Sequence, residues 1–262
     1  MVNSRKVHEY LLVLLVCGGG SLFGPAMAGP LHDAVRAGEE PAVLEALSTT
    51  EDINETDFVL GSALHLAVVE SKPGIVRILL ERGADIDAPS ELEARTALHL
   101  AADAGESELV SLLLEEGANV DSRDRSGKQA IHIATISGHA DIVARLLEAG
   151  ASVDSREPAE GMTPLLIASL QGKVDLVKLL VDRGADMEAR SFSGRTPFFF
   201  STSMESYVNV GDDRLMRYFA EKGVDRNPKD NAGHTPLQWA NSRNVPAYQE
   251  IAEILKRLGV ER

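Results

Sequence analysis

The sequence is poor in cysteine, in aromatic residues and in positive charge. Its single cysteine, Cys17, excludes an intrachain disulfide framework and a four-thiolate zinc site. Lys and Arg number 26 against 40 Asp and Glu, which gives a formal net charge of -14. Because such a surface repels a phosphate backbone, we expect no nucleic-acid partner. The hydrophobic fraction of 44% with 25% charged residues indicates a globular body that buries its own core.

The N-terminus carries an apolar run that is too short to span a membrane. Leu11–Cys17 provides seven apolar residues, whereas a transmembrane helix needs about 20. The run follows the basic pair Arg5 and Lys6 and precedes a small-x-small sequence with Ala26 and Ala28 at its ends. This order is typical of a secretory signal peptide that is cleaved after Ala28.

We therefore predict a signal peptide over residues 1–28 and a mature chain that starts at Gly29. The mature protein is expected to be periplasmic or secreted, without stable membrane insertion, and free of cysteine. A retained N-terminal anchor and an uncleaved cytosolic protein are the alternatives. Lipid attachment at Cys17 is a third alternative, which the bulky Val16 before it disfavours.

Two short phrases recur through the rest of the chain at a spacing of about 33 residues. The first has alanine or proline, then three mostly apolar residues, and usually ends in alanine. It begins at Ala63, Ala97, Ala130, Pro164, Pro197 and Pro236. The second phrase, glycine-alanine followed by a polar residue, begins at Gly83, Gly117, Gly150 and Gly184. Two markers in a fixed phase indicate a repeat protein.

The phrases resemble the T-P-L-H-x-A and G-A-D signatures of the ankyrin repeat. The resemblance covers residues 29–262 and implies an all-α solenoid, in which helix-turn-helix units stack and are joined by extended turns. The residue types agree with this fold, because hydroxyl side chains precede the first helices and glycines follow the second helices. The hydroxyl residues are Ser62, Thr96, Thr163, Thr196 and Thr235, and the glycines are Gly83, Gly117, Gly150, Gly184 and Gly223.

We divide the mature chain into seven units, of which the first and the last are caps. The expected units are 29–57, 58–90, 91–124, 125–157, 158–190, 191–230 and 231–262. Each unit buries its faces against its neighbours, so we predict one continuous domain over 29–262, present as a monomer.

Four histidines occupy the same position of the repeat, which argues against a shared metal site. They are His32, His65, His99 and His132. Equivalent positions of successive units lie about 8 to 10 Å apart, whereas zinc ligands converge to about 2 Å from the ion. The resemblance implies that each imidazole joins the turn to the helix start by hydrogen bonds. Leu166, Phe199 and Gln238 replace it in later units, which we expect to be less firmly tied.

No motif for catalysis or cofactor binding is present in the sequence. A P-loop and a dinucleotide-binding glycine pattern are both missing, and the mature chain has no thiol nucleophile. Ser201 and Ser203 lie in a unit that has lost its histidine. We therefore predict no catalytic residue, no metal and no cofactor. An enzyme with a site in the long unit 191–230 is the rival hypothesis.

The expected function is recognition of another protein through the concave face made by the turns and the first helices. The candidate contact residues of the first helices are Val69, Glu70, Asp103, Ile136 and Leu170. Those of the turns are Leu92, Arg95, Arg125, Lys128, Phe192 and Arg195. Val69, Ile136 and Leu170 are expected to form an exposed apolar line, with scattered surface aliphatics as the alternative.

The unit 191–230 is longer than its neighbours, and the extra residues fall near Met204–Asp213. It is also rich in aromatic residues, of which Phe199 and Tyr207 are the candidates for exposure and for a second contact site. The sequence thus predicts an exported, non-enzymatic binding scaffold. It could neutralise or stabilise an exported enzyme or toxin, and a purely structural spacer is a further alternative.

Overall fold

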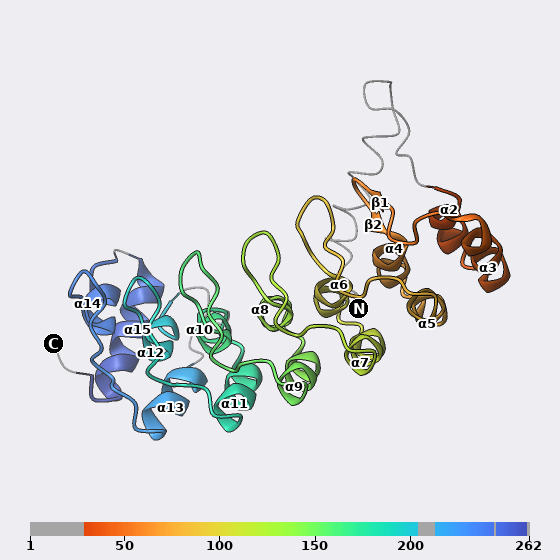
Figure 1. Ribbon diagram of the computed structural model, residues 1–262. Coiled ribbons are helices and arrows are strands. Elements are labelled where there is room, and N and C mark those ends of the chain that lie inside the picture. Colours follow the sequence, from red (N-terminus) through yellow and green to blue (C-terminus); the bar gives the residue numbers. More distant parts are fainter. Residues whose placement is uncertain (1–28, 204–212, 244, 261–262) are drawn as a thin grey trace, which may run out of the picture.

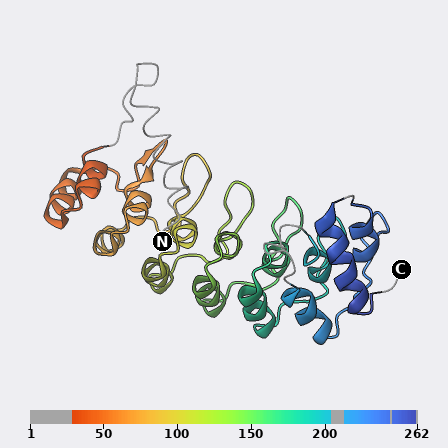
Figure 2. The ribbon, with the colours of Figure 1, turned by 180° about the vertical axis from the view of Figure 1, so that it is seen from behind.

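The computed structural model describes residues 29–203, 213–243 and 245–260, which form stacked pairs of helices (Figures 1 and 2). The first helices of the pairs are α2 (Pro30–Ala37), α4 (Ala63–Val69), α6 (Ala97–Ala104), α8 (Ala130–Ser137), α10 (Pro164–Leu170), α12 (Pro197–Phe200) and α14 (Pro236–Asn241). The second helices are α3 (Glu40–Thr49), α5 (Pro73–Glu81), α7 (Ser107–Glu115), α9 (Ala140–Glu148), α11 (Val174–Asp182), α13 (Arg214–Glu221) and α15 (Pro246–Arg257). The expected all-α solenoid is confirmed. The expected cleavage site at Ala26 and Ala28, and Tyr207, lie outside the described residues.

The helices form two layers that share one core. In one layer α4 packs on α6 and α6 on α8, while in the other α5 packs on α7 and α7 on α9. Buried apolar side chains form one continuous cluster that runs from Leu31 to Val260. Ala67, Ala101 and Ala134 are fully buried in the first helices, where their small size lets neighbouring helices approach closely. In the described part of the chain, no helix is both long and apolar enough to cross a membrane.

The helix ends follow the residue types that the sequence places there. The Thr163 hydroxyl accepts a hydrogen bond from the Leu166 backbone N–H at 3.3 Å, and proline occupies the first position of α10. Beyond α7, Gly117 has a φ of 91°, and a Cβ atom there would meet nothing within 4 Å. The left-handed backbone conformation alone therefore requires glycine at this position.

Between successive helix pairs the chain forms a hairpin-like turn that projects beyond the first helices (Figure 1). In the first of these turns, two short antiparallel strands, β1 (Thr56–Asp57) and β2 (Gly61–Ser62), pair with Thr56 opposite Ser62. A later turn is closed by Asp124, whose Oδ1 accepts from the Lys128 backbone N–H at 2.8 Å. Burial would raise the pKa of Asp124, but hydrogen bonds from Ser126 and Lys128 hold it below its ordinary value.

Neighbouring turns are also tied to one another. The Phe192 N–H donates to the carbonyl oxygen of Glu160 at 2.7 Å, which joins two successive turns. The Arg156 guanidinium donates to the Gly161 carbonyl of its own turn at 2.8 Å and to the Arg190 carbonyl of the next at 2.6 Å. Arg123 and Arg190 repeat this arrangement in their own units. The turns are therefore a fixed part of the solenoid.

Candidate protein-binding surface

The turns and the first helices line one side of the solenoid, which we call the inner face. Five of the predicted contact residues are exposed on it. They are Val69, Glu70, Leu92, Arg125 and Phe192. Val69 and Phe192 are 59% and 61% exposed, which is high for large apolar side chains.

Arg95 and Asp103 lie together on the inner face as an ion pair. Arg95 Nη1 is 3.3 Å from Asp103 Oδ2, and its Nε is 2.8 Å from Glu93 Oε2 and 3.9 Å from Asp124 Oδ2. Three carboxylates thus surround one guanidinium that is 17% exposed. The ion pair between Arg95 and Asp103, both predicted contact residues, thus joins a turn to the helix α6 beside it. Lys128 is half-buried, and its Nζ lies 3.0 Å from Ser126 Oγ.

The expected exposed line of Val69, Ile136 and Leu170 is wrong for its last two members. Ile136 and Leu170 are partly buried against a second apolar cluster on the inner face. Its buried residues are Met162, Leu166, Ile167, Ala189 and Phe200. The cluster forms because Leu166 replaces the repeat histidine and Phe200 lies in the next first helix. Val69 alone stays bare.

Phe199 was expected to be exposed, and this is also wrong. It is 1% exposed, and its ring meets the ring of Trp239 edge-on with centroids 5.9 Å apart. The Arg195 guanidinium lies 4.8 Å from the Phe199 ring and 5.1 Å from the Trp239 ring. Arg243 approaches Trp239 to 5.0 Å. The sequence analysis missed Trp239 and Arg243, although the chain's single tryptophan within a repeat phrase is a signal that could have indicated them.

The repeat histidines act as structural hydrogen-bonding groups. His65 Nδ1 accepts from the Ser62 backbone N–H at 3.1 Å, and its Nε2 donates to the Arg95 carbonyl at 2.9 Å. The imidazole is therefore neutral and joins its helix start to the next unit. Burial lowers the pKa of His65 and His99, and that of His132 to about 4. Among the residues that the structure describes, no group of three or more metal-ligating side chains gathers.

In the units without the histidine, Leu166, Phe199 and Gln238 occupy its position at the start of the first helix. Gln238 Oε1 accepts from the Thr235 N–H at 3.1 Å and so replaces the histidine at the helix start. Leu166 and Phe199 are buried and make apolar contacts instead of hydrogen bonds. Leu166 and Phe199 thus lack both histidine hydrogen bonds and Gln238 keeps the one at the helix start, so the weaker tying of these units stays a prediction.

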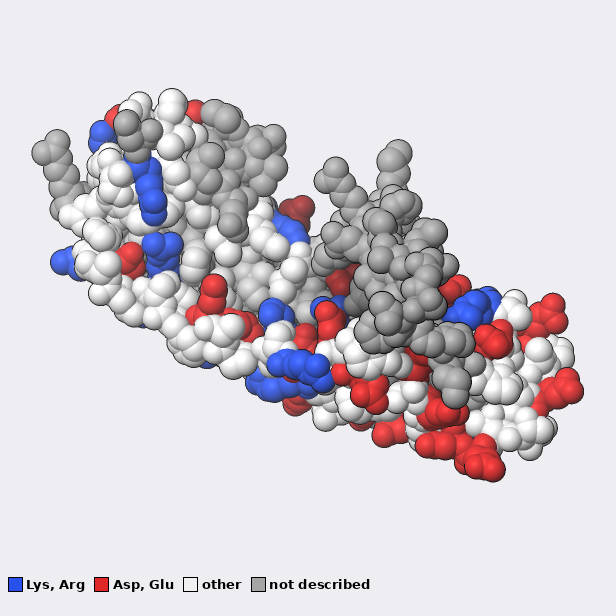
Figure 3. Space-filling view, turned by 90° about the horizontal axis from the view of Figure 1, so that it is seen from above, with Lys and Arg blue, Asp and Glu red and all other residues white. Residues whose placement is uncertain are grey.

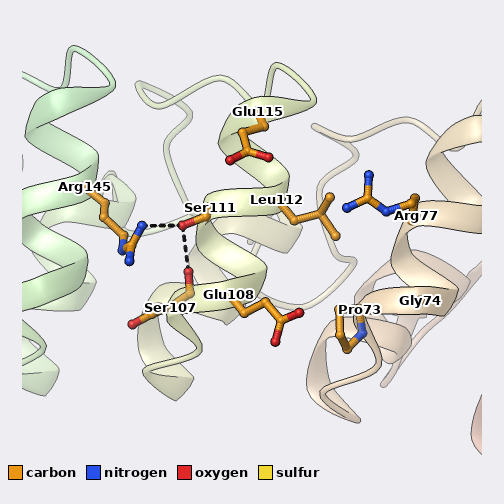
Figure 4. A pocket seen from close by; sticks show the side chains of 9 residues that line it. All are labelled: Pro73, Gly74, Arg77, Ser107, Glu108, Ser111, Leu112, Glu115 and Arg145. Atoms are coloured by element: carbon orange, nitrogen blue, oxygen red, sulfur yellow. Dashed lines mark hydrogen bonds between the residues drawn. The ribbon is translucent and has the colours of Figure 1, made fainter.

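A hollow of about 600 Å³ lies on the opposite side, among α5, α7 and α9 (Figure 4). Across it, Arg145 donates to Ser111 Oγ at 2.7 Å, and Ser111 Oγ donates to the Ser107 carbonyl at 3.0 Å. Ser107 in turn donates to Asp141, which lowers the pKa of that carboxyl. The bonds of Arg145 and Asp141 connect α9 to α7, so the hollow is the space between neighbouring second helices.

Charge is distributed unevenly along the solenoid. Residues 29–120 hold 19 Asp and Glu against 5 Lys and Arg, whereas residues 121–262 hold 20 against 19. Acidic side chains gather at the end formed by the N-terminal repeats, and most basic side chains lie over the other repeats (Figure 3). Almost the whole net negative charge of residues 29–262 thus belongs to residues 29–120.

Comparison with known proteins agrees with the repeat architecture. Two models of ankyrin repeats match residues 64–157 and 136–181. A putative ankyrin repeat protein of fowlpox virus, FPV240, is 36% identical over 67 residues, which are 25% of this chain and 16% of the viral protein. The crystal structure of the ankyrin repeat domain of Bcl-3, described as a unique member of the IkappaB protein family, matches with a TM-score of 0.74 at 27% identity. That match covers 87% of this chain and 98% of the other.

The chain therefore has the fold of an ankyrin repeat domain, as its sequence motifs predict. Ankyrin repeats typically mediate protein–protein binding and are generally scaffolds without enzymatic activity. The matched segment spans about a sixth of the viral relative.

Proposed function

We propose that this protein is an exported, non-enzymatic scaffold that binds a partner protein through its inner face. The observation that carries the proposal is that the backbone of this face is held by hydrogen bonds while several of its apolar side chains are exposed. The backbone of the turns is held by ladders of hydrogen bonds, whereas Val69, Leu92 and Phe192 are left exposed on it. A rigid surface with bare apolar side chains is suited to binding, because little ordering is needed on association.

Binding and a purely structural role differ in what they require of Val69 and Leu92. A spacer gains nothing from exposed apolar side chains, whereas an interface gains free energy when it buries them.

The proposed partner is an exported enzyme or toxin that the scaffold neutralises or stabilises. An enzymatic site in 191–230 remains the rival, and loss of an activity with retained binding would favour it.

The proposal is tested by capturing partners from the exported fraction with the wild-type protein and with Val69→Lys/Leu92→Lys. The matched control is Leu44→Lys, because Leu44 is a similarly exposed apolar residue on the second helix α3. A partner that binds wild type and the control saturably, but not the double variant, supports the proposal. Absence of any saturable partner would favour the spacer.

The exported location is tested separately by the intact mass and the fractionation of the expressed protein. We expect the mass of a chain that begins at Gly29 and a location outside the cytoplasm. A retained Met1 inside the cell would remove the exported enzyme or toxin as a partner while leaving the binding scaffold.

A further inference from the structure

We propose that the N-terminal half of the inner face docks a basic segment of the partner that also carries apolar side chains. This inference rests on the proposed binding function and adds the chemistry of the bound segment. The surface consists of the first two turns and the helix α4, and its apolar members are Phe58, Val69 and Leu92.

Phe58 and Leu92 lie in adjacent turns. Phe58 is 66% exposed in the turn between β1 and β2, and Leu92 is 42% exposed in the turn that follows α5. Thr56 Oγ1 donates to Glu91 Oε1 at 2.9 Å and joins the two turns directly. The two apolar side chains therefore belong to neighbouring elements that are fixed to each other.

Val69 is the last residue of α4, which lies between these two turns in the chain. The equivalent residue in the next repeat is Asp103, which contacts the turn residue Arg95 at 3.3 Å. In the repeat after that it is Ile136, which packs on a cluster that contains the turn residue Met162. The side chain at this position thus contacts a turn residue in one repeat and is partly buried against an apolar cluster in the next, whereas Val69 is 59% exposed. An apolar group of the partner would cover it.

The charged groups around this apolar surface are mainly carboxylates. Glu70 follows Val69 and is exposed, and Glu91 and Glu93 flank Leu92 on the next turn. Two cations lie nearby: Arg95 is already surrounded by three carboxylates, and the guanidinium of the exposed Arg125 donates to the Glu91 carbonyl oxygen at 2.8 Å. Salt screens exposed charges over about 8 Å at physiological ionic strength, so the attraction of these carboxylates for a basic segment should weaken as salt is raised.

The rest of the solenoid, residues 121–262, lacks this excess of acidic side chains. Its charges nearly balance, and Arg195 and Arg243 both lie against Trp239 on its last repeats. Its exposed apolar turn residue, Phe192, follows Arg190 and precedes Arg195. A basic segment is therefore expected on the N-terminal half, and Leu44, an exposed apolar residue on the second helix α3, supplies the control.

The test uses three short fluorescent peptides and the full-length protein. One alternates lysine and leucine, the second alternates glutamate and leucine, and the third alternates lysine and serine. Fluorescence anisotropy is measured with wild type, with Phe58→Ala/Leu92→Ala, with Glu70→Gln/Glu91→Gln and with the control Leu44→Ala.

We expect the lysine–leucine peptide to bind saturably, more tightly than either other peptide and more weakly as salt is raised. Each double variant should weaken it at least about tenfold, whereas Leu44→Ala should leave it unchanged. Circular dichroism and urea unfolding show whether the variants stay folded.

Equal binding of the glutamate–leucine peptide, no binding of the lysine–leucine peptide, or unchanged binding by both folded double variants would overturn the inference. Repeating the capture experiment with Phe58→Ala/Leu92→Ala separates this failure from that of the proposed function. A partner whose binding survives the loss of Phe58 and Leu92 leaves the scaffold function in place without this docking segment.

Discussion

The Nε2 atom of His65 donates a hydrogen bond of 2.9 Å to the carbonyl oxygen of Arg95 in the next repeat. Its Nδ1 atom meanwhile accepts from the backbone N–H of Ser62, so the ring is needed in its neutral form. His99 and His132 make the same pair of bonds, to Lys128 and to Ser155. One imidazole thus holds both its own helix start and the junction between two repeats.

The stability of the fold is expected to fall as the pH is lowered through the range in which histidine titrates. Burial lowers the pKa of His132 from 6.5 to about 4 in the folded state. Between these values the unfolded chain binds a proton that the folded chain does not, so acid favours unfolding. From pH 7 to pH 5 this one residue should cost about 2 kcal/mol of unfolding free energy, measured by urea denaturation.

His132→Gln isolates that contribution, because Gln238 shows that glutamine can fill the same place at a helix start. The variant should lose about 2 kcal/mol of the pH dependence, and His234→Gln, which changes a half-exposed side chain, is the control. An unchanged pH dependence in His132→Gln would contradict the assignment.

Acid should open the solenoid from its N-terminal half. The buried histidines whose pKa is lowered lie in α4, α6 and α8. In α10, α12 and α14 the same repeat position is held by Leu166, Phe199 and Gln238. Hydrogen exchange, expressed as protection factors, should show a loss of at least about tenfold at pH 5 in α4, α6 and α8 relative to α10 and α14. Equal losses along the chain would show that the histidines do not decide where unfolding begins.

Replacing Phe199 by alanine should destabilise the C-terminal repeats strongly. The ring is buried between Arg195 and Trp239, and removing a buried phenylalanine costs about 3–5 kcal/mol. Phe192→Ala is the matched control, since that ring is 61% exposed and should change stability by less than about 1 kcal/mol. Trp239 is the single tryptophan, so its fluorescence reports this transition directly. A similar small effect in both variants would mean that Phe199 is not packed as described.

Arg156→Lys should lower stability by about 1–2 kcal/mol. One guanidinium nitrogen, Nη1, donates to two carbonyls in successive turns, and the flexible side chain of lysine loses more conformational freedom when it places its ammonium there. The control is the exposed residue Arg82, where Arg82→Lys should change the urea midpoint little. A midpoint for Arg156→Lys equal to that of the control would show that the arginine ladder adds no stability.

The sequence by itself determined the repeat and the order of its helices. Hydroxyl residues such as Thr163, prolines at helix starts and glycines such as Gly117 act through local backbone geometry, which the neighbouring residues set. Contact with another repeat decided the rest. Phe199 and Ile136 occupy positions that face solvent in a single unit, but the following repeats bring Trp239 against the first and a buried apolar cluster against the second. Likewise, Arg95 and Asp103 neutralise each other only because a turn folds onto the helix beside it. Exposure on the inner face depends on the size and charge of the neighbouring repeat's side chains, so only the tertiary structure singled out Phe58, Val69 and Leu92 as bare.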